Sequence, residues 1–282
     1  MTEISTNTKM IGLLGYPLSH TFSPRMQNAA FEDKDINCIY LPIEVKPDNL
    51  DTVIRGITSM NFDGFNITKP FKTEIMKYLD EVDELASRIG AVNAVVIKDG
   101  QLKGYNTDGM GFLRSLKKTL YPSIVNKRIF VLGSGGAARA ICMVLAMAGT
   151  EKINICNRTY EKAVDLAEDI NKYVPNSSNA IPMEYEEMEK AIKNTDILIN
   201  ATCVGTFPNV NEVPIDTNLL NNQLAVCDVV YNPAKTKLLI EAEKHGCKTM
   251  SGLGMLVYQG AEAFELWTGK NAPIGVMFDA IS

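Results

Sequence analysis

The chain has 282 residues, of which 46% are hydrophobic and 22% charged, and its formal net charge is -5. These proportions are typical of a globular protein, and the length favours two domains, because single domains usually run to about 100–200 residues. The acidic balance argues against a nucleic-acid partner, which normally needs a basic surface. No apolar run is long enough for a membrane helix, and the N-terminus lacks a signal-peptide pattern. We therefore expect a cytoplasmic protein with no membrane partner.

The cysteines and histidines argue against a metal site. The six cysteines contain no CxxC pair, and the chain has only two histidines. This spacing favours neither a structural zinc site nor a disulfide framework, so we expect no metal and mostly reduced, buried thiols. With so few histidines, acid–base chemistry would have to use other side chains.

Apolar runs in the first hundred residues predict strands at residues 11–16, 38–45 and 63–68. A helix is predicted at about residues 24–31. Pro70 suits the first turn of a further helix, where its missing N–H costs nothing. Residues 91–97 and 101–106 are predicted to form a hairpin, because Asp99-Gly100 between them is a strong turn signal.

The middle of the chain has a different pattern. Buried-type strands are expected at residues 127–133, 152–158, 196–202 and 224–231, and helical segments alternate with them. This alternation is the sequence form of a doubly wound parallel sheet, so the fold class is α/β. Beyond residue 250 the pattern becomes helical, and we expect this tail to pack against the first domain.

A glycine-rich turn joins the strand at 127–133 to the following helix. Its sequence, GSGGAA over residues 133–138, fits the dinucleotide fingerprint. The first glycine permits a tight turn, the second lets the backbone approach a pyrophosphate, and Ala138 lets helix and strand pack closely. An ordinary glycine-rich turn is the alternative, but strand, helix and next strand follow in the required order. The phosphates would lie at the helix N-terminus.

The end of the next strand bears on the choice of cofactor. An NAD site usually places a carboxylate there, to bind the ribose hydroxyls. This chain has Asn157, Arg158 and Thr159 instead, with Lys162 one turn further on. Arg158 can bind a 2′-phosphate through two hydrogen bonds, and Lys162 adds a positive charge. A solvated arginine is the alternative, but within a dinucleotide fold this pattern favours NADP.

The run NITKPFK, residues 66–72, carries the first candidate for chemistry. Asn66 and Thr68 would share one face of a strand. Lys72 would then fall near the third position of the helix expected from Pro70, where a cation opposes the helix dipole. Such a costly placement suggests a function for Lys72, although most lysines are solvated surface residues. Lys69 ranks below it, because it should point to the opposite face from Thr68.

Other polar side chains are candidates for the same site, and each also has a structural explanation. Asp108 could cap the helix that follows it, and Asn93 lies in the predicted hairpin. Thr21 and Ser23 could bind a carboxylate or cap the helix after Pro24. Further candidates, which could equally be structural, are Tyr231 at the end of the last buried strand and Gln259 in the C-terminal helix.

Taken together, these motifs resemble the shikimate dehydrogenase family. The resemblance rests on motifs in the family's order through nearly the whole chain: GYPLSHTFSPRMQN, NITKPFK, GAVN, NTD, GSGGAAR, NRT, NAT, DVVYNP and GMLVYQGAEAFELWTG. It implies a substrate-binding α/β domain of residues 1–106 plus 251–282, and an NADP-binding Rossmann domain of residues 107–250. The implied activity is the reversible, NADPH-dependent reduction of 3-dehydroshikimate to shikimate in aromatic amino acid biosynthesis, by a monomer or homodimer.

The resemblance also implies a role for individual residues. The implied catalytic residues are Lys72 and its partner Asp108. The implied substrate-binding residues are Thr21, Ser23, Thr68, Asn93, Asp108, Tyr231 and Gln259. The implied cofactor-binding residues are Glu84, Gly133, Ser134, Gly135, Gly136, Ala137, Asn157, Arg158, Thr159, Lys162, Val229 and Gly252.

Two departures from the family pattern keep alternatives open. Thr21 stands where the family has serine, and its added methyl group crowds the carboxylate end of the pocket. Gln27 stands where the family usually has histidine. The first departure leaves open a quinate/shikimate dehydrogenase using NAD or NADP. A non-catalytic ligand sensor of the same fold is the other alternative, but it would need neither Lys72 nor Asp108.

Overall fold

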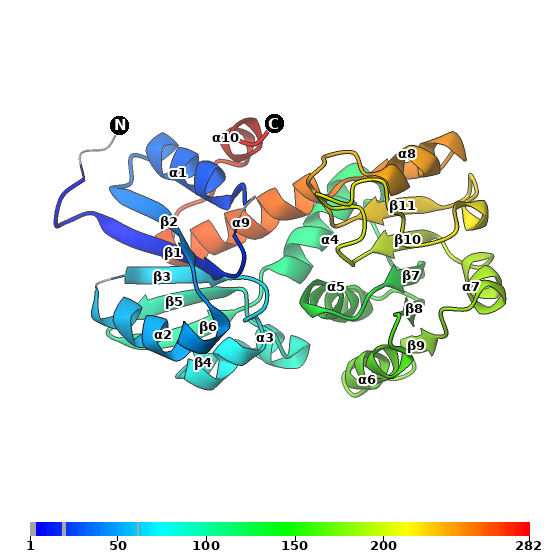
Figure 1. The fold of residues 1–282 in the computed structure, drawn as a ribbon, viewed down its shortest axis with the longest axis horizontal. Helices are drawn as coiled ribbons and strands as arrows, with labels where there is room; N and C mark the ends of the chain where they lie inside the picture. Colours follow the sequence, from blue (N-terminus) through cyan, green and yellow to red (C-terminus); the bar gives the residue numbers. More distant parts are fainter. Residues whose placement is uncertain (1–3, 19–20, 61) are drawn as a thin grey trace. The chain divides into compact units, whose positions relative to one another are not determined.

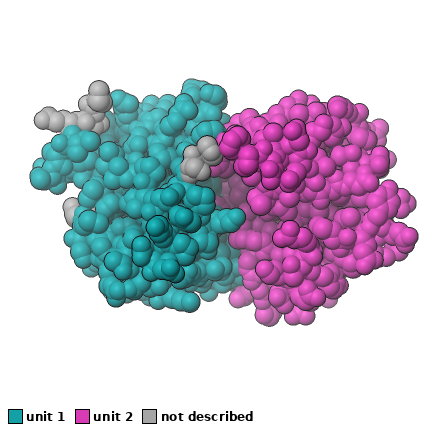
Figure 2. Space-filling view, in the orientation of Figure 1, with its two compact units in different colours: residues 1–107, 257–282 teal, residues 108–256 magenta. Residues whose placement is uncertain are grey.

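The computed structural model describes residues 4–18, 21–60 and 62–282. The chain divides into two compact units, one of residues Met1–Thr107 and Val257–Ser282 and the other of residues Asp108–Leu256 (Figure 2). Each unit contains its own six-stranded sheet (Figure 1). The division at the C-terminal side falls within the long helix α9 (Gly252–Thr268).

The first unit is built on a mixed sheet with the strand order β2-β1-β3-β5-β6-β4. Its strands are β1 (Lys9–Gly15), β2 (Cys38–Glu44), β3 (Phe62–Ile67), β4 (Glu81–Val82), β5 (Ala94–Lys98) and β6 (Gln101–Tyr105). Strand β1 pairs in parallel with both β2 and β3, whereas β3, β5 and β6 pair antiparallel. The predicted hairpin is confirmed, because Asp99 and Gly100 both have positive φ and connect paired residues Lys98 and Gln101.

Helices cover this sheet and bury its apolar side chains. They are α1 (Ser23–Asp33), α2 (Leu50–Ser59), α3 (Glu84–Ile89), α10 (Ile274–Asp279) and the two 3₁₀ helices Pro47–Asn49 and Glu74–Tyr78. Phe65 of β3, Ile57 of α2 and Phe71 are buried in one cluster. On α1, the Phe31 ring stacks on Phe264 of α9 at 5.3 Å, so the C-terminal tail is part of this unit.

The second unit has a wholly parallel sheet with the strand order β12-β11-β10-β7-β8-β9. Its strands are β7 (Arg128–Leu132), β8 (Lys152–Cys156), β9 (Ser178–Ile181), β10 (Ile197–Asn200), β11 (Ala225–Asp228) and β12 (Lys248–Met250). Two halves therefore diverge from β7 and β10, which is the Rossmann arrangement. The predicted doubly wound parallel sheet is confirmed, and ligands of such sheets bind beyond the carboxyl ends of the strands.

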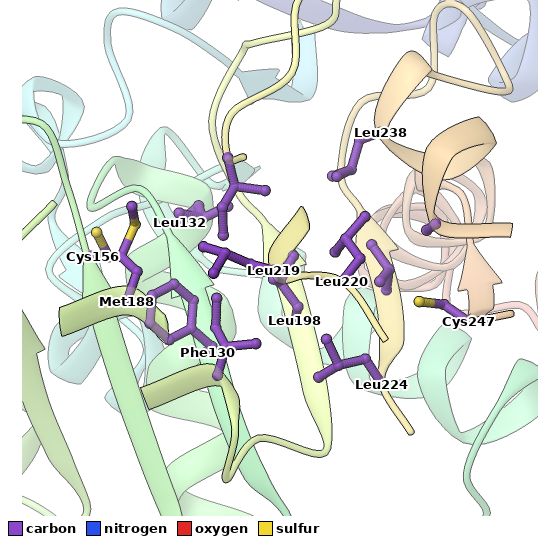
Figure 3. Packing of buried hydrophobic residues seen from close by; sticks show 14 of the residues in the cluster. Phe130, Leu132, Cys156, Met188, Leu198, Leu219, Leu220, Leu224, Leu238 and Cys247 are labelled. Atoms are coloured by element: carbon purple, nitrogen blue, oxygen red, sulfur yellow. The ribbon is translucent and has the colours of Figure 1, made fainter. Parts of the chain in front are cut away.

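The helices of this unit are α4 (Asp108–Thr119), α5 (Gly136–Met147), α6 (Tyr160–Asn171), α7 (Tyr185–Ile192), α8 (Lys237–Lys244) and the 3₁₀ helix Thr217–Leu219. Apolar side chains from the strands and α8 form one buried cluster (Figure 3). Phe130, Leu198 and Leu238 are among its members. This core fixes the strand ends that carry the polar residues described below.

One predicted element is absent. Residues Pro70–Thr73 do not begin a helix but form turns, and the 3₁₀ helix begins only at Glu74. The Phe71 side chain is fully buried. The backbone N–H of Phe71 donates to the Thr68 carbonyl, and this hydrogen bond closes a turn. Lys72 therefore does not lie in the first turn of a helix, and the helix-dipole argument for it was wrong.

Within the described residues, none of the helices combines the length and the apolar character that crossing a bilayer requires.

Candidate functional site

The glycine-rich turn lies where the Rossmann arrangement requires it, between β7 and α5. Gly133 has a φ of 108°, which disfavours any other residue, and an added Cβ would lie 3.0 Å from the Ala201 carbonyl oxygen. Its N–H donates to the Cys156 carbonyl at the end of β8. Gly135 precedes α5, and an added Cβ there would meet no atom within 4 Å. Gly133 thus permits a tight turn, and the space beside Gly135 is open to a ligand.

The N-terminus of α5 is suited to an anion. In the part of the chain that the structure describes, no side chain caps this helix and no acidic residue lies in its first turn. Its first N–H groups and the positive end of its dipole are therefore available to a phosphate. Ala138 is fully buried, in agreement with close packing of helix and strand.

A Gly135→Ala substitution separates cofactor binding from folding. The backbone at Gly135 has a φ of -74°, which alanine adopts readily, and the added methyl group meets open space. We expect the free energy of unfolding to change by less than about 0.5 kcal/mol. The KM for NADP+ should rise about 10-fold, because the methyl group would occupy the approach of the pyrophosphate. Urea denaturation and steady-state kinetics measure both, and an unchanged KM would contradict the assignment of the loop.

The end of β8 carries the predicted cofactor-selecting residues. Strand β8 ends at Cys156, and Asn157, Arg158 and Thr159 follow before α6 begins at Tyr160. The Asn157 amide donates to the Thr159 carbonyl over 2.9 Å, which shapes this turn. The Arg158 and Lys162 side chains are exposed. Two cations are therefore presented to solvent just beyond the second strand, as a 2′-phosphate site requires.

A buried carboxylate lies at the end of β11, and sequence reasoning assigned it no role. Asp228 is fully buried and accepts hydrogen bonds from Asn200 Nδ2 (3.0 Å), the Val230 N–H (3.0 Å) and Thr236 Oγ1 (2.6 Å). The signal available in the sequence was a polar residue ending each of two adjacent apolar strands, Asn200 on β10 and Asp228 on β11.

Burial raises the pKa of Asp228 to about 6, although its hydrogen bonds from Thr236, Val230 and Asn200 act in the opposite direction. Because this pKa lies above that of the unfolded chain, the stability that the group contributes is present below about pH 4 and is lost as the pH rises through about 6. Relative to an Asp228→Asn variant, the parent should gain on the order of 3 kcal/mol of unfolding free energy between about pH 7 and about pH 4. Urea denaturation of both proteins measures this, and a pH-independent difference would contradict it.

The segment after β11 carries two further predicted residues. Val229 contacts Gly252 closely enough that a Cβ on Gly252 would lie 2.3 Å from the Val229 carbonyl oxygen. The two predicted cofactor residues are thus neighbours, and Gly252 requires the absence of a side chain. Tyr231 was predicted to end the last buried strand. Strand β11 ends earlier, at Asp228, and Tyr231 lies three residues beyond it. It is half-buried, and burial raises the pKa of its hydroxyl.

In the first unit, a row of buried polar side chains begins at α1. Ser23 is buried at the start of this helix, and its N–H lies 3.3 Å from Thr21 Oγ1. The Ser23 side chain hydrogen-bonds Tyr40, whose hydroxyl donates to Asn66 Oδ1 over 2.7 Å. Asn66 Nδ2 in turn donates to the Asn93 carbonyl over 2.9 Å. This row links Ser23 with Asn93, two of the predicted substrate residues.

The row continues through Asn93 to the C-terminal helix. Asn93 Oδ1 accepts the Thr107 N–H over 2.8 Å, and its Nδ2 donates to Thr107 Oγ1 over 2.9 Å. Asn93 Nδ2 also lies 3.4 Å from Gln259 Oε1 on α9. The structure therefore brings Asn93 and Gln259 together, although the sequence separates them by more than half of the chain. Tyr40 and Thr107 belong to this row, and sequence reasoning missed both.

The Lys72 backbone is hydrogen-bonded to the residue that precedes Asn93 of this row in the chain. Its carbonyl accepts the Val92 N–H over 2.8 Å, one residue before Asn93. The Lys72 side chain is half-buried, whereas Lys69 is exposed, which supports the preference for Lys72. Thr68 is also half-buried and lies one residue beyond β3, so it is not part of the strand as predicted.

Two further predicted residues, Asp108 and Glu84, lie at helix starts. Asp108 is the first residue of α4 and is 5% exposed, an unusual burial for a carboxylate. It directly follows Thr107. Glu84 is the first residue of α3, exposed, and forms an ion pair with Arg88 one turn later. Gln27, the second departure from the family pattern, is fully buried and donates from Nε2 to the Gly260 carbonyl over 2.8 Å.

The thiols offer no alternative chemistry in the buried parts of the chain. All six cysteines are free. Burial raises the pKa of Cys142 to about 12 and that of Cys156 to about 11, so both stay protonated and unreactive near neutral pH. Among the described residues, no group of His, Cys, Asp and Glu side chains is arranged to hold a metal ion.

Comparison with known proteins agrees with this geometry. A shikimate dehydrogenase (NADP(+)) of Methanocaldococcus jannaschii is 46% identical over 279 residues, which span 99% of this chain and 98% of that protein. The chain belongs to the shikimate dehydrogenase family. The resemblance stated from the motifs is thus confirmed, and with it the prediction of an oxidoreductase.

Family profiles and solved structures extend the match to both units. Profiles of the shikimate dehydrogenase family match residues 13–95 (substrate binding domain), 115–212 (shikimate/quinate 5-dehydrogenase) and 252–281 (C-terminal domain). A crystal structure of a shikimate dehydrogenase in complex with NADP+ is 44% identical, with a TM-score of 0.92 over 99% of this chain and 96% of that one. A Listeria monocytogenes shikimate 5-dehydrogenase in complex with shikimate and NAD is 40% identical, with a TM-score of 0.92 over 100% and 99%.

Proposed function

We propose that the protein catalyses the reversible, NADPH-dependent reduction of 3-dehydroshikimate to shikimate, in the biosynthesis of aromatic amino acids. The observation that supports this most is the row of polar side chains in the first unit, which are buried except for the half-buried Gln259. It joins residues of four distant segments, Ser23, Asn66, Asn93 and Gln259, into one set of hydroxyl and amide groups. Such groups, which donate and accept hydrogen bonds without charge, suit a polyhydroxylated ring.

The residues of the second unit fit NADP. The loop Gly133–Ala137 and the N-terminus of α5 would hold the pyrophosphate, and Arg158, supported by Lys162, would bind the 2′-phosphate. We further assign Glu84, Asn157, Thr159, Val229 and Gly252 to the cofactor. When bound, NADPH supplies the hydride that reduces the carbonyl carbon of the substrate.

Lys72 and Asp108 are the proposed catalytic pair. The Lys72 ammonium would stabilise the negative charge that develops on the carbonyl oxygen and deliver a proton to it. The Asp108 carboxylate would accept hydrogen bonds from Lys72 and a substrate hydroxyl and so orient both. In the oxidation direction, Lys72 Nζ would take the hydroxyl proton back.

The other substrate residues would fix the ring. We assign the carboxylate of the substrate to Thr21 and Ser23, and the rest of the ring to Thr68, Asn93, Asp108, Tyr231 and Gln259. Monomer or homodimer remains the proposed assembly, with a small molecule as the binding partner. The free thiols support a reducing compartment, so the cytoplasm is the proposed location.

Quinate is the second candidate substrate. Thr21 leaves quinate open, because the added methyl group changes the carboxylate end of the pocket and quinate carries one more hydroxyl than shikimate. Thr21 is half-buried beside Ser23, so its added methyl group would lie next to a residue that is proposed to bind the substrate.

The test is NADPH oxidation by the purified protein with 3-dehydroshikimate as the only other substrate. We expect turnover at an ordinary enzymatic rate, on the order of 1–10³ per second. The absence of substrate-dependent NADPH oxidation, in a protein shown to be folded, would exclude the proposed activity.

A further inference from the structure

The carboxylate of Asp228 holds together three segments of the second unit. Its three hydrogen-bond donors are the Asn200 side chain at the end of β10, the Val230 N–H in the loop after β11, and the Thr236 hydroxyl at the start of α8. All four residues are buried, Asn200, Asp228 and Thr236 fully so. Hydrogen bonds to a buried carboxylate are stronger than those between neutral groups and restrict geometry accordingly.

On one side, this network reaches the glycine-rich loop. Asn200 Oδ1 accepts hydrogen bonds from the Thr202 N–H (3.1 Å) and hydroxyl (2.7 Å). The segment fixed in this way lies against Gly133, since a Cβ there would be 3.0 Å from the Ala201 carbonyl oxygen and 3.1 Å from Thr202 Cγ2. The carboxylate is therefore connected to the loop proposed to bind the pyrophosphate through the Asn200 side chain and the Ala201–Thr202 segment.

On the other side, the network reaches the loop after β11. Asp228 holds the Val230 N–H, and the Gly252 N–H donates to the Val230 carbonyl over 3.3 Å. Val229 contacts Gly252 on the same side. The loop that carries Val229 and Tyr231 is therefore held from both sides, by the Asp228 carboxylate and by the first turn of α9.

We propose that Asp228 is a positioning residue that keeps the glycine-rich loop and the Val229–Tyr231 loop in the mutual arrangement that NADP binding and hydride transfer require. This inference rests on the proposed function, because both loops are assigned to cofactor and substrate there. Stability alone does not account for the residue, because burial of this carboxylate is costly for the fold. Asparagine would retain most of the hydrogen bonds without that cost.

The experiment compares Asp228→Ala with Asp228→Asn. Alanine removes the three hydrogen bonds that the Asp228 carboxylate accepts, whereas the asparagine Oδ1 can still accept from Asn200 and Val230, and its Nδ2 can donate to Thr236 Oγ1. Ser178→Ala is the matched control. It also loses buried hydroxyl hydrogen bonds in the second unit, to the Ala167 carbonyl and Asn171 Oδ1, but it lies at the start of β9.

Four quantities are measured: the dissociation constant of NADP+ by calorimetry, KM and kcat for shikimate oxidation, and the primary isotope effect with shikimate deuterated at the carbon that gives the hydride. For Asp228→Ala we expect about 10-fold weaker NADP+ binding, a lower kcat and a larger isotope effect, because misplacement slows the chemical step. Asp228→Asn should recover most of each loss, and Ser178→Ala should match the parent.

A kcat that falls only in proportion to the folded fraction, with the NADP+ dissociation constant and isotope effect unchanged, would overturn the positioning role. If Asp228→Ala does not fold, Thr202→Val decides, since it removes one hydroxyl from the same network and keeps the side-chain shape. Unchanged NADP+ affinity in that variant also overturns the role. If the parent binds NADP+ but oxidises no shikimate, the proposed function fails, whereas the calorimetric comparison still tests Asp228.

Discussion

Replacing Lys72 with alanine is expected to lower kcat by about 10²- to 10⁴-fold. The KM for shikimate should change much less, because the charge that Lys72 stabilises exists on the substrate oxygen only in the transition state. The half-buried side chain, next to the segment that carries Asn93, supports this role. Steady-state kinetics in the oxidation direction, with NADP+ saturating, measure both constants.

Lys69→Ala is the matched control for this prediction. Lys69 lies three residues earlier in the same turn region, carries the same charge, and is exposed. Its removal should leave kcat within about two-fold of the parent, since solvated surface charges contribute little. Near-normal turnover of Lys72→Ala, or an equal loss in the two variants, would remove Lys72 from the catalytic role.

Replacing Arg158 with alanine is expected to raise the KM for NADP+ by about 10- to 100-fold, which corresponds to the loss of a charge-assisted, two-point hydrogen bond to phosphate. The KM for NAD should stay close to that of the parent, because NAD lacks the 2′-phosphate. Arg158 follows β8 directly and is exposed, so the substitution leaves no cavity. Parallel kinetics with both cofactors measure the change in preference.

Arg55→Ala controls for the loss of one positive charge. Arg55 is an exposed arginine of α2 in the other unit, paired with Asp51, and should leave both cofactor constants unchanged. If the parent already uses NAD better than NADP+, or if Arg158→Ala weakens both cofactors equally, Arg158 does not select NADP.

The second unit could be predicted from sequence in most respects. Its parallel sheet was predicted from strong apolar runs that alternate with helical patterns. The turn at Gly133 and Gly135 marked where the first strand meets its helix. Arg158 was predicted as a cofactor residue by position alone, because a residue at the end of the second strand has a fixed relation to that turn, and the structure places it just beyond β8. Local patterns therefore suffice to predict which residues follow the strand ends.

The buried polar network of the first unit could be predicted only in part. Asn93 and Gln259 were named as candidates, but their meeting depends on how α9 packs on the sheet, which no local pattern encodes. Tyr40 was missed because an aromatic residue in a strand is ordinarily a core residue, and only its hydrogen bond to Asn66 reveals a polar role.

The incorrect helix at Pro70 has a different origin. Proline is common in the first turn of helices, but the burial of Phe71 and its hydrogen bond to Thr68 close a turn there instead. Tertiary packing therefore overrode a local preference. Asp228 was missed because the sequence shows only an aspartate at the end of an apolar strand. Its burial and its three hydrogen-bond donors are known only from the structure.

Hydride transfer between NADP and shikimate can be tested by comparing four pairs of acid and cofactor. Initial rates of the purified parent are measured with shikimate and with quinate, each with NADP+ and with NAD, to give four values of kcat/KM. We predict the largest value for shikimate with NADP+. If neither acid reduces either cofactor, the proposed activity is excluded, and a larger value for quinate with NAD would reverse the assignment of both substrate and cofactor.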